Sequence, residues 1–257
     1  MITRIIKKIF NIFGYEIISS KYKDFYSAQD LDKIYKKLFN DANLVIFDVG
    51  ANIGQSIDRF RKIFPQSIIH CFEPIKENYL YIKKNYSQQK IFTNNLAMGD
   101  QIGKKKFFIN VKSGTSSFYP INKKSKWAKI RSNEKSVTID EFTKSEEEVE
   151  VMTVDKYCEN NNIKKIDILK IDVQGYENKV LEGAINTIKN GLINTMEIEM
   201  NFSDHYEKKL SFYDIEKLLV PNGYELCAIK NTGWYFLDDS TTWFLDCVYK
   251  NKKLNKN

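Results

Sequence analysis

Residues 44–55 read L-V-I-F-D-V-G-A-N-I-G-Q, a short apolar run followed by a loop with two glycines. The run 44–47 is typical of a strand that is buried on both faces of a parallel sheet. Residues 55–64 continue with helical periodicity and stop before Pro65. In open α/β sheets, the loop between such a strand and helix is where ligands bind. The stretch therefore predicts an α/β fold with a ligand site at residues 48–54.

Two acidic residues stand at the expected ends of neighbouring strands. Asp48 ends the first, and Glu73 follows a second apolar run over residues 67–72. An acidic side chain at the second position can accept hydrogen bonds from both hydroxyls of a ribose. The loop lacks the third glycine of the dinucleotide pattern G-x-G-x-x-G, and Asp48 suits a cationic ligand better than a phosphate. We expect a nucleoside-bearing ligand, the plainer alternative being that these residues only form tight turns.

Strands and helices alternate along most of the chain, as in a doubly wound parallel sheet. Further strands are expected around residues 91–96, 166–171 and 195–200. Helices are expected around residues 31–38, 77–85, 154 onward, 177–190 and 212–220. An antiparallel pair of strands at 224–229 and 243–249 is expected to close the sheet. Residues 104–152 break the pattern and predict an inserted irregular or β segment that acts as a lid. We divide the chain into an N-terminal helical extension (1–40), a main domain (41–250) and a tail (251–257).

The composition narrows the class of protein. The four cysteines are widely spaced without a C-x-x-C pair, which disfavours a zinc site or disulfide framework and fits a reduced, cytoplasmic setting. The net charge of +7 comes from scattered lysines, so we do not expect nucleic acid as a partner. Residues 1–13 place apolar side chains at helical spacing. This helix packs on its own domain or on a second subunit of a homo-oligomer, or it lies on an anionic membrane surface.

Six ordered motifs carry a resemblance to a known family: D-V-G-A-N-I-G-Q (48–55), F-E-P (72–74), N-L-A-M-G-D (95–100), T-V-D (153–155), L-K-I-D-V-Q-G-Y-E (169–177) and V-L-E-G-A (180–184). Together they resemble the FkbM family of methyltransferases. The resemblance implies a class I methyltransferase fold with a Rossmann-like sheet, S-adenosylmethionine as cofactor and O-methylation of sugar hydroxyls. It implies that the cofactor-binding residues are Asp48, Gly50, Asn52, Gly54, Glu73, Asn95, Ala97 and Asp172.

Two residues are candidates for the catalytic base. Asp172 follows the expected strand 166–171, where a carboxylate can orient the amine of the donor or accept a proton from the substrate. His205 lies in the loop after strand 195–200, and the strand alternation points Glu199 toward the same cleft. The family typically has glutamate where this chain has Gln174, which removes one carboxylate, so we expect no metal site.

These observations predict a cytoplasmic S-adenosylmethionine-dependent O-methyltransferase that acts on a sugar or glycan and works at the inner face of the membrane if the N-terminal helix binds there. The aromatic residues at 234–236 and 243 are a candidate sugar platform, with a core or dimer surface as the alternative. Three other functions stay open: an N- or carboxyl-methyltransferase, a nicotinamide-dependent oxidoreductase, which the missing glycine disfavours, and a non-catalytic glycan-binding scaffold.

Overall fold

A seven-stranded sheet forms the centre of the protein, with the strand order β3-β2-β1-β7-β8-β10-β9. The computed structural model describes residues 30–40, 43–87, 90–202, 204–231 and 243–253, together with residues 6, 10 and 12. The strands are β1 (Val45–Val49), β2 (Ile68–Phe72), β3 (Ile91–Asn94), β7 (Ile166–Ile171), β8 (Ile193–Asn201), β9 (Tyr224–Asn231) and β10 (Phe244–Asn251). Neighbours from β3 to β8 are parallel, and β10 is antiparallel to both β8 and β9. The predicted mostly parallel sheet with an antiparallel closing strand is confirmed.

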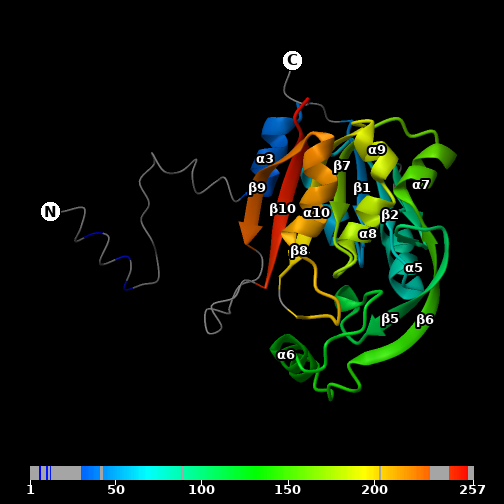
Figure 1. Cartoon of the computed structure of the whole chain (residues 1–257), viewed down its shortest axis with the longest axis vertical. Coiled ribbons are helices and arrows are strands. Elements are labelled where there is room, and N and C mark those ends of the chain that lie inside the picture. The colour runs from blue at the N-terminus through cyan, green and yellow to red at the C-terminus, as the bar shows by residue number, and fades with distance from the viewer. Residues whose placement is uncertain are drawn as a thin grey trace.

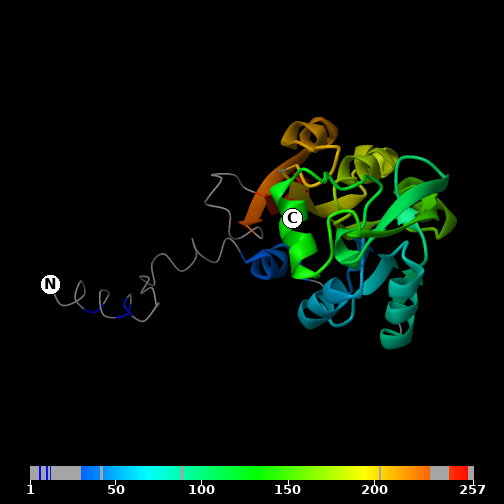
Figure 2. The same cartoon turned by 90° about the horizontal axis from the view of Figure 1, so that it is seen from below.

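Helices cover both faces of this sheet (Figure 1, Figure 2). One layer contains α3 (Leu31–Leu38), α4 (Gln55–Ile63) and α5 (Lys76–Asn85), and the other α7 (Val154–Asn160), α8 (Glu177–Glu182), α9 (Ile185–Lys189) and α10 (Phe212–Leu219). Successive side chains of a strand point to opposite faces. In β1, Ile46 therefore packs with Ile57 of α4, whereas Phe47 belongs to the core that contains Val180 of α8. This two-sided burial explains the continuous apolar run that begins the ligand loop.

The prediction of a single helix over residues 177–190 is wrong, because the structure has two short helices there. α8 ends at Glu182 and α9 begins at Ile185. Between them, a Cβ added to Gly183 would overlap the backbone carbonyl oxygen of Gly99. The backbone of Gly183 also accepts a hydrogen bond from the amide of Asp155 at 3.0 Å. Close packing of the segment after β3 against this point interrupts the helix, which the periodicity of the sequence does not reveal.

The insertion is more regular than predicted. It contributes most of a second sheet with the order β4-β6-β5, formed by β4 (Ala97–Met98), β5 (Gly103–Asn110) and β6 (Thr143–Met152). The 3-10 turn η2 (Ser113–Thr115) and the helix α6 (Lys126–Glu134) lie between β5 and β6 in the chain, whereas a second such turn, η3 (Val220–Asn222), follows α10. Helix α6, which the sequence analysis missed, lies at the lower end of the molecule in Figure 1. Its N-cap is Ser125, whose side chain accepts a hydrogen bond from the amide of Ala128.

Some expectations concern residues that the structure does not describe. The amphipathic helix predicted over residues 1–13 lies outside the described residues apart from residues 6, 10 and 12, and the aromatic segment 234–236 lies outside them entirely. None of the helices in the described part of the chain is long and apolar enough to cross a membrane.

Candidate active site

The loop after β1 is held against the ends of two neighbouring strands. The amides of Gly50 and Ala51 both donate to the carbonyl oxygen of Phe72, at 3.0 and 3.1 Å. Gly50 has a φ of +86°, and a Cβ added to it would overlap the carbonyl oxygen of Asp172. Glycine is required here both for the left-handed backbone and for this close approach. The carboxyl ends of β1, β2 and β7 therefore meet at one edge of the sheet.

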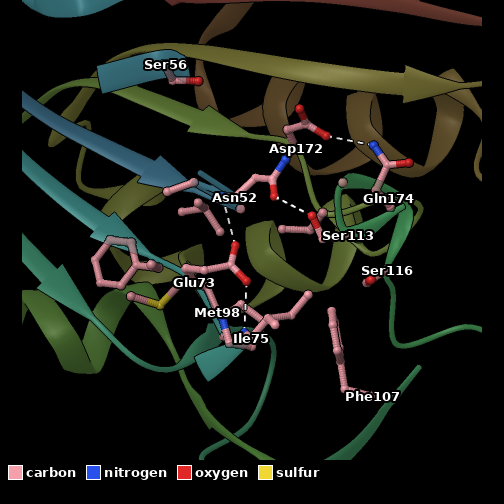
Figure 3. Close-up of a pocket in the computed structure, with 18 of the residues that line it drawn as sticks. Asn52, Ser56, Glu73, Ile75, Met98, Phe107, Ser113, Ser116, Asp172 and Gln174 are labelled. Carbon is pink, nitrogen blue, oxygen red and sulfur yellow. Dashed lines mark hydrogen bonds between the residues drawn. The ribbon is translucent and has the colours of Figure 1, made fainter. Parts of the chain in front are cut away.

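Glu73 extends from the end of β2 toward this loop (Figure 3). Its Oε2 accepts a hydrogen bond from the amide of Asn52 at 2.8 Å, and its Oε1 accepts one from the amide of Ile75 at 2.8 Å. The side chain is buried, and burial raises the pKa of Glu73 to about 7. Each carboxylate oxygen keeps a second lone pair for a further donor. Glu73 can thus accept hydrogen bonds from two hydroxyls at once, which suits the ribose-binding role predicted for it.

Asn52 connects the loop to the insertion. Its backbone has a φ of +48°, and its side-chain Oδ1 accepts a hydrogen bond from Ser113 Oγ at 3.0 Å (Figure 3). The same oxygen accepts a second hydrogen bond from Asn78 Nδ2, also at 3.0 Å. Gly114 packs against the same side chain, because a Cβ at this position would lie 3.0 Å from Asn52 Nδ2. The turn η2 therefore closes over the ligand loop and forms one wall of the space beside Glu73.

A first cavity opens at this edge of the sheet (Figure 3). Its apolar wall includes Phe72, Ile75, Ala97, Met98, Phe107, Phe118 and Val173, and its polar wall includes Asn52, Gln55, Ser56, Glu73, Ser113, Ser116, Lys170, Asp172 and Gln174. The polar wall includes the first turn of α4, whose N-terminus has no side-chain cap and so attracts a carboxylate. An apolar slot, a carboxylate with spare lone pairs and a charged end together fit an adenosine that carries an amino-acid chain.

Five of the eight residues predicted to bind the cofactor line this cavity, namely Gly50, Asn52, Glu73, Ala97 and Asp172. The other three, Asp48, Gly54 and Asn95, do not line the cavity but contact the segments that form it. Gly54 is the N-cap of α4 with a φ of +96° and packs on the Tyr86 ring. Asn95 donates from Nδ2 to the carbonyl oxygens of Glu73, at 3.0 Å, and Pro74, at 2.9 Å, and so shapes the turn after β2.

Asp48 is the third of these supporting residues. It is fully buried, and burial raises its pKa to about 6. Its Oδ1 lies 3.9 Å from Lys170 Nζ, whose charge partly offsets the cost of burying a carboxylate. Lys170, which the sequence analysis did not assign to the site, also lies 3.3 Å from Asp172 Oδ2. One lysine of β7 thus connects the ends of β1 and β7.

Asp172 and Glu199 form a pair of carboxyl groups bridged by Gln174. Gln174 Nε2 donates to Asp172 Oδ1 at 2.8 Å and to Glu199 Oε2 at 2.6 Å. Burial opposes ionisation of Asp172, but Lys170 and the hydrogen bond from Gln174 outweigh it and hold the pKa of Asp172 below its ordinary value. Burial, followed by repulsion from Asp172, raises the pKa of Glu199 well above the usual range. Asp172 is therefore the member of the pair that ionises more readily, and Glu199 the member that keeps its proton to higher pH.

Glu177 shapes the turn that presents Gln174. Its Oε1 accepts hydrogen bonds from the amides of Val173, at 3.1 Å, and Gly175, at 3.0 Å, while Gln174 between them takes a left-handed φ of +58°. The side chain is fully buried, and burial raises the pKa of Glu177 to about 7. Its observed contacts are therefore structural. Across the described ranges, no group of three or more His, Cys, Asp or Glu side chains is placed to hold a metal ion.

A second cavity adjoins the first, and both are lined by Gly114 and Gln174. Its remaining lining residues are Lys112, Thr115, Trp127, Arg131, Glu199, Asn201, His205 and Phe244. His205 stacks on Trp127 with 4.6 Å between ring centroids, and its Nδ1 lies 3.1 Å from Asn201 Oδ1. Burial lowers the pKa of His205 to about 3, so the imidazole is neutral at physiological pH. The structure places this candidate base in the second cavity and Asp172 in the first.

Sequence reasoning expected the insertion to act as a lid but assigned none of its residues to a site. Phe107, Ser113 and Ser116 line the first cavity, and Trp127 and Arg131 line the second. The Ser/Gly-rich stretch 113–117 was the available signal, since small polar residues allow a turn to approach a ligand loop closely. Nothing in the local pattern around residues 126–134 shows that this helix faces the end of β8.

Comparisons with known proteins agree with this geometry. Residues 48–226, more than half of the chain, match the family described as "Methyltransferase FkbM domain". The chain is 26% identical to the 2-O-methyltransferase NoeI of Sinorhizobium fredii over 191 residues, which cover 72% of this chain and 73% of that protein. It is 24% identical to Methyltransferase 1 of Beauveria bassiana over 210 residues, 79% of this chain and 81% of that protein.

Solved structures also include similar chains. A SAM-dependent methyltransferase from Aquifex aeolicus aligns over 91% of this chain and 98% of that chain, with 10% identity and a TM-score of 0.41. The family match and the named relatives confirm the predicted family, enzyme class and cofactor. This chain therefore belongs to the FkbM methyltransferase family and is an S-adenosylmethionine-dependent methyltransferase.

Proposed function

We propose that the protein methylates a hydroxyl group of a sugar, with the methyl donor in the first cavity and the acceptor in the second. The observation that carries this proposal is that Gly114 and Gln174 line both cavities. Groups bound in the two cavities therefore meet beside Gln174. The relative NoeI is named a 2-O-methyltransferase, which supports an oxygen acceptor.

The second cavity has the surfaces that a sugar ring requires. Trp127 and Phe244 offer aromatic surface for the C–H face of a sugar. Asn201, His205 and Glu199 offer polar groups for its hydroxyls. Because His205 is neutral and its Nδ1 is already occupied by Asn201, its Nε2 remains to make a hydrogen bond with the acceptor.

Asp172 is the residue best suited to receive the proton of the acceptor hydroxyl. S-adenosylmethionine supplies a methyl group that its sulfonium has already activated, so the protein has to orient the acceptor and remove one proton. Asp172 lines the first cavity, is ionised at neutral pH and is oriented by Gln174 and Lys170. The pKa of His205, about 3, and that of Asp172 both lie far below neutral pH, so position decides between them: Asp172 lines the first cavity, whereas His205 lines the second.

We further propose that the acceptor is a polysaccharide, a glycolipid or one of their precursors and that methylation takes place in the cytoplasm. Contact with the inner face of the membrane through residues 1–13 and assembly into a homo-oligomer both remain predictions from the sequence. Membrane contact would bring the cavities close to lipid-linked glycans.

The test uses purified protein, trideuteromethyl S-adenosylmethionine and a glycan fraction from cells that lack the gene. We expect glycan fragments to gain the mass of one trideuteromethyl group and linkage analysis to locate it on oxygen. Asp172→Asn should incorporate label roughly 100-fold more slowly. Lys129→Met, a change on the exposed side of α6, should label as the wild type does. Label that appears only on amines or carboxyl groups would overturn the proposal.

A further inference from the structure

The second cavity contains two cations from the insertion. Lys112 precedes η2, Arg131 belongs to α6, and both line the cavity. Helix α6 lies at the lower end of the molecule in Figure 1 and faces the viewer in Figure 2, which is seen from below. The fold therefore brings two positive charges to the end of the acceptor cavity that the insertion forms.

Their shared acidic neighbour is Glu134. Arg131 Nη1 lies 2.9 Å from both Glu134 oxygens, and Lys112 Nζ lies 3.9 Å from Glu134 Oε2. One carboxylate thus forms ion pairs with two cations. The positive charge of Lys135 also acts on Lys112. Burial, followed by repulsion from Arg131, lowers the pKa of Lys112. Among the described residues, the positive charges of Lys112, Arg131 and Lys135 outnumber the one carboxylate, Glu134, that pairs with them.

Two polar atoms of the cavity lining have no partner. Arg131 Nε and His205 Nε2 are both buried and lack a hydrogen bond within the part of the chain that the structure describes. His205 is only 1% exposed, so its ring cannot simply turn to water. Buried polar groups are normally satisfied, and those left open in a cavity indicate a ligand that completes them. The pair thus points to a polar ligand in the second cavity, independently of the charge imbalance.

Two carboxyl groups, those of Asp172 and Glu199, are linked through Gln174, which lines this cavity. Glu199 also lines this cavity, and Asp172 lines the first cavity on the other side of Gln174. The carboxylate of Asp172 therefore lies next to Gln174, where the proton of an acceptor hydroxyl must be received. Positive charge is concentrated at Arg131, whose guanidinium carbon lies 6.0 Å from the centroid of the Trp127 ring.

We propose that the acceptor sugar carries an anionic group, a carboxylate or a phosphate, that binds Arg131 and Lys112. This inference rests on the proposed function, because it names the chemical class of the acceptor in the second cavity. The guanidinium fork matches carboxylate and phosphate oxygens, and such charge-assisted hydrogen bonds are about twice as strong as neutral ones. The anion anchors one side of the sugar and directs the hydroxyl on the other side toward Asp172.

The experiment measures binding of small probes to protein saturated with S-adenosylhomocysteine. The shifts of the Trp127 resonances in NMR spectra of labelled protein report on the second cavity and tolerate weak affinities. The probes are glucuronate for a carboxylate, glucose 1-phosphate for a phosphate, methyl glucoside as the neutral sugar, and inorganic phosphate alone. We expect at least one anionic sugar to bind roughly 10-fold more tightly than methyl glucoside, as a charged hydrogen bond provides.

Matched variants assign this preference to the two cations. Arg131→Met and Lys112→Met should each reduce the affinity for the anionic sugar about 10-fold while leaving methyl glucoside unchanged. Lys129→Met on the same helix removes a charge that does not line the cavity and should leave all affinities unchanged. Lys112 is partly exposed, so its variant keeps the test valid if Arg131→Met fails to fold. An unchanged affinity for S-adenosylhomocysteine shows that each variant is folded.

Several outcomes would overturn the inference. Equal binding of methyl glucoside and the anionic sugars would show that the charge is not recognised, even if glycan labelling succeeds and the proposed function stands. Binding of inorganic phosphate as tight as that of glucose 1-phosphate would show an anion site without a sugar. If no sugar shifts the Trp127 resonances, the inference fails, and absence of glycan labelling would show that the proposed function fails with it.

Discussion

Gly50 and Asp172 touch through their backbones: a side chain on Gly50 would collide with the carbonyl oxygen of Asp172. The two residues follow neighbouring parallel strands, and the amide of Asp172 donates to the carbonyl oxygen of Val49 at 3.0 Å. The loop proposed to bind the methyl donor and the proposed base are therefore positioned by one contact. A substitution that breaks this contact should therefore displace both the loop and Asp172.

Replacement of Gly50 by alanine should destabilise the protein and abolish binding of S-adenosylhomocysteine. The matched control is Gly223→Ala, because Gly223 has the same φ of +86° but has open space around it. We expect the control to lose about 1–2 kcal/mol of unfolding free energy through backbone strain alone and to keep full affinity. Urea denaturation and calorimetry measure both quantities. Equal losses in the two variants would contradict the close contact.

Binding of S-adenosylhomocysteine at pH 6.5 should release protons from Glu73. The free protein holds this carboxyl partly protonated, because burial raises its pKa to about 7. Hydrogen bonds from ribose hydroxyls favour the ionised form and lower the pKa, which expels the proton. Calorimetry in two buffers with different ionisation enthalpies measures the release.

The variant Glu73→Gln should release fewer protons and bind about 10-fold more weakly, since the ribose loses a charged acceptor. Asp48, whose pKa of about 6 also allows proton release, is intact in this variant and serves as the internal reference. The same proton release in wild type and variant would remove Glu73 from the ribose site.

Asp172→Asn should lower kcat by roughly 100-fold or more while the affinity for S-adenosylhomocysteine changes little, because a general base contributes mainly to the chemical step. The pKa of Asp172 lies below its ordinary value, so acidification to pH 5 should not reduce activity through this residue. His205→Gln is the comparison: we expect it to raise the KM for the acceptor more than it lowers kcat. The reverse pattern in the two variants would identify His205 as the base.

The buried carboxyl of Glu177 should make the protein less stable as the pH rises. Its pKa is about 7 in the folded protein and about 4.5 in the unfolded chain, so the folded state binds more protons between these values. The free energy of unfolding then decreases from pH 4.5 to pH 7, by about 3 kcal/mol for this group. Urea denaturation at pH 5 and pH 8 should show a smaller decrease for Glu177→Gln than for wild type. Identical decreases would show that Glu177 does not titrate in this range.

The sequence by itself determined the fold and the edge of the sheet at which the first cavity opens. Buried strands and their helices appear as local periodicity, and parallel strands bring their carboxyl ends together, so Gly50, Glu73 and Asp172 were predictable as neighbours. The break at Gly183 was not predictable, because it depends on contact with a segment more than eighty residues earlier in the chain.

Only the tertiary structure decided which polar side chains act together. Glu197 and Glu199 share one face of β8, yet Arg59 binds Glu197 at 2.6 Å whereas Gln174 binds Glu199. Alternation along a strand determines the face of a side chain but not the partner that packing brings to it. For the same reason, the opening loop indicated a ligand site from its sequence alone, while the two adjoining cavities that meet at Gln174 emerged only from long-range packing of the insertion against the sheet.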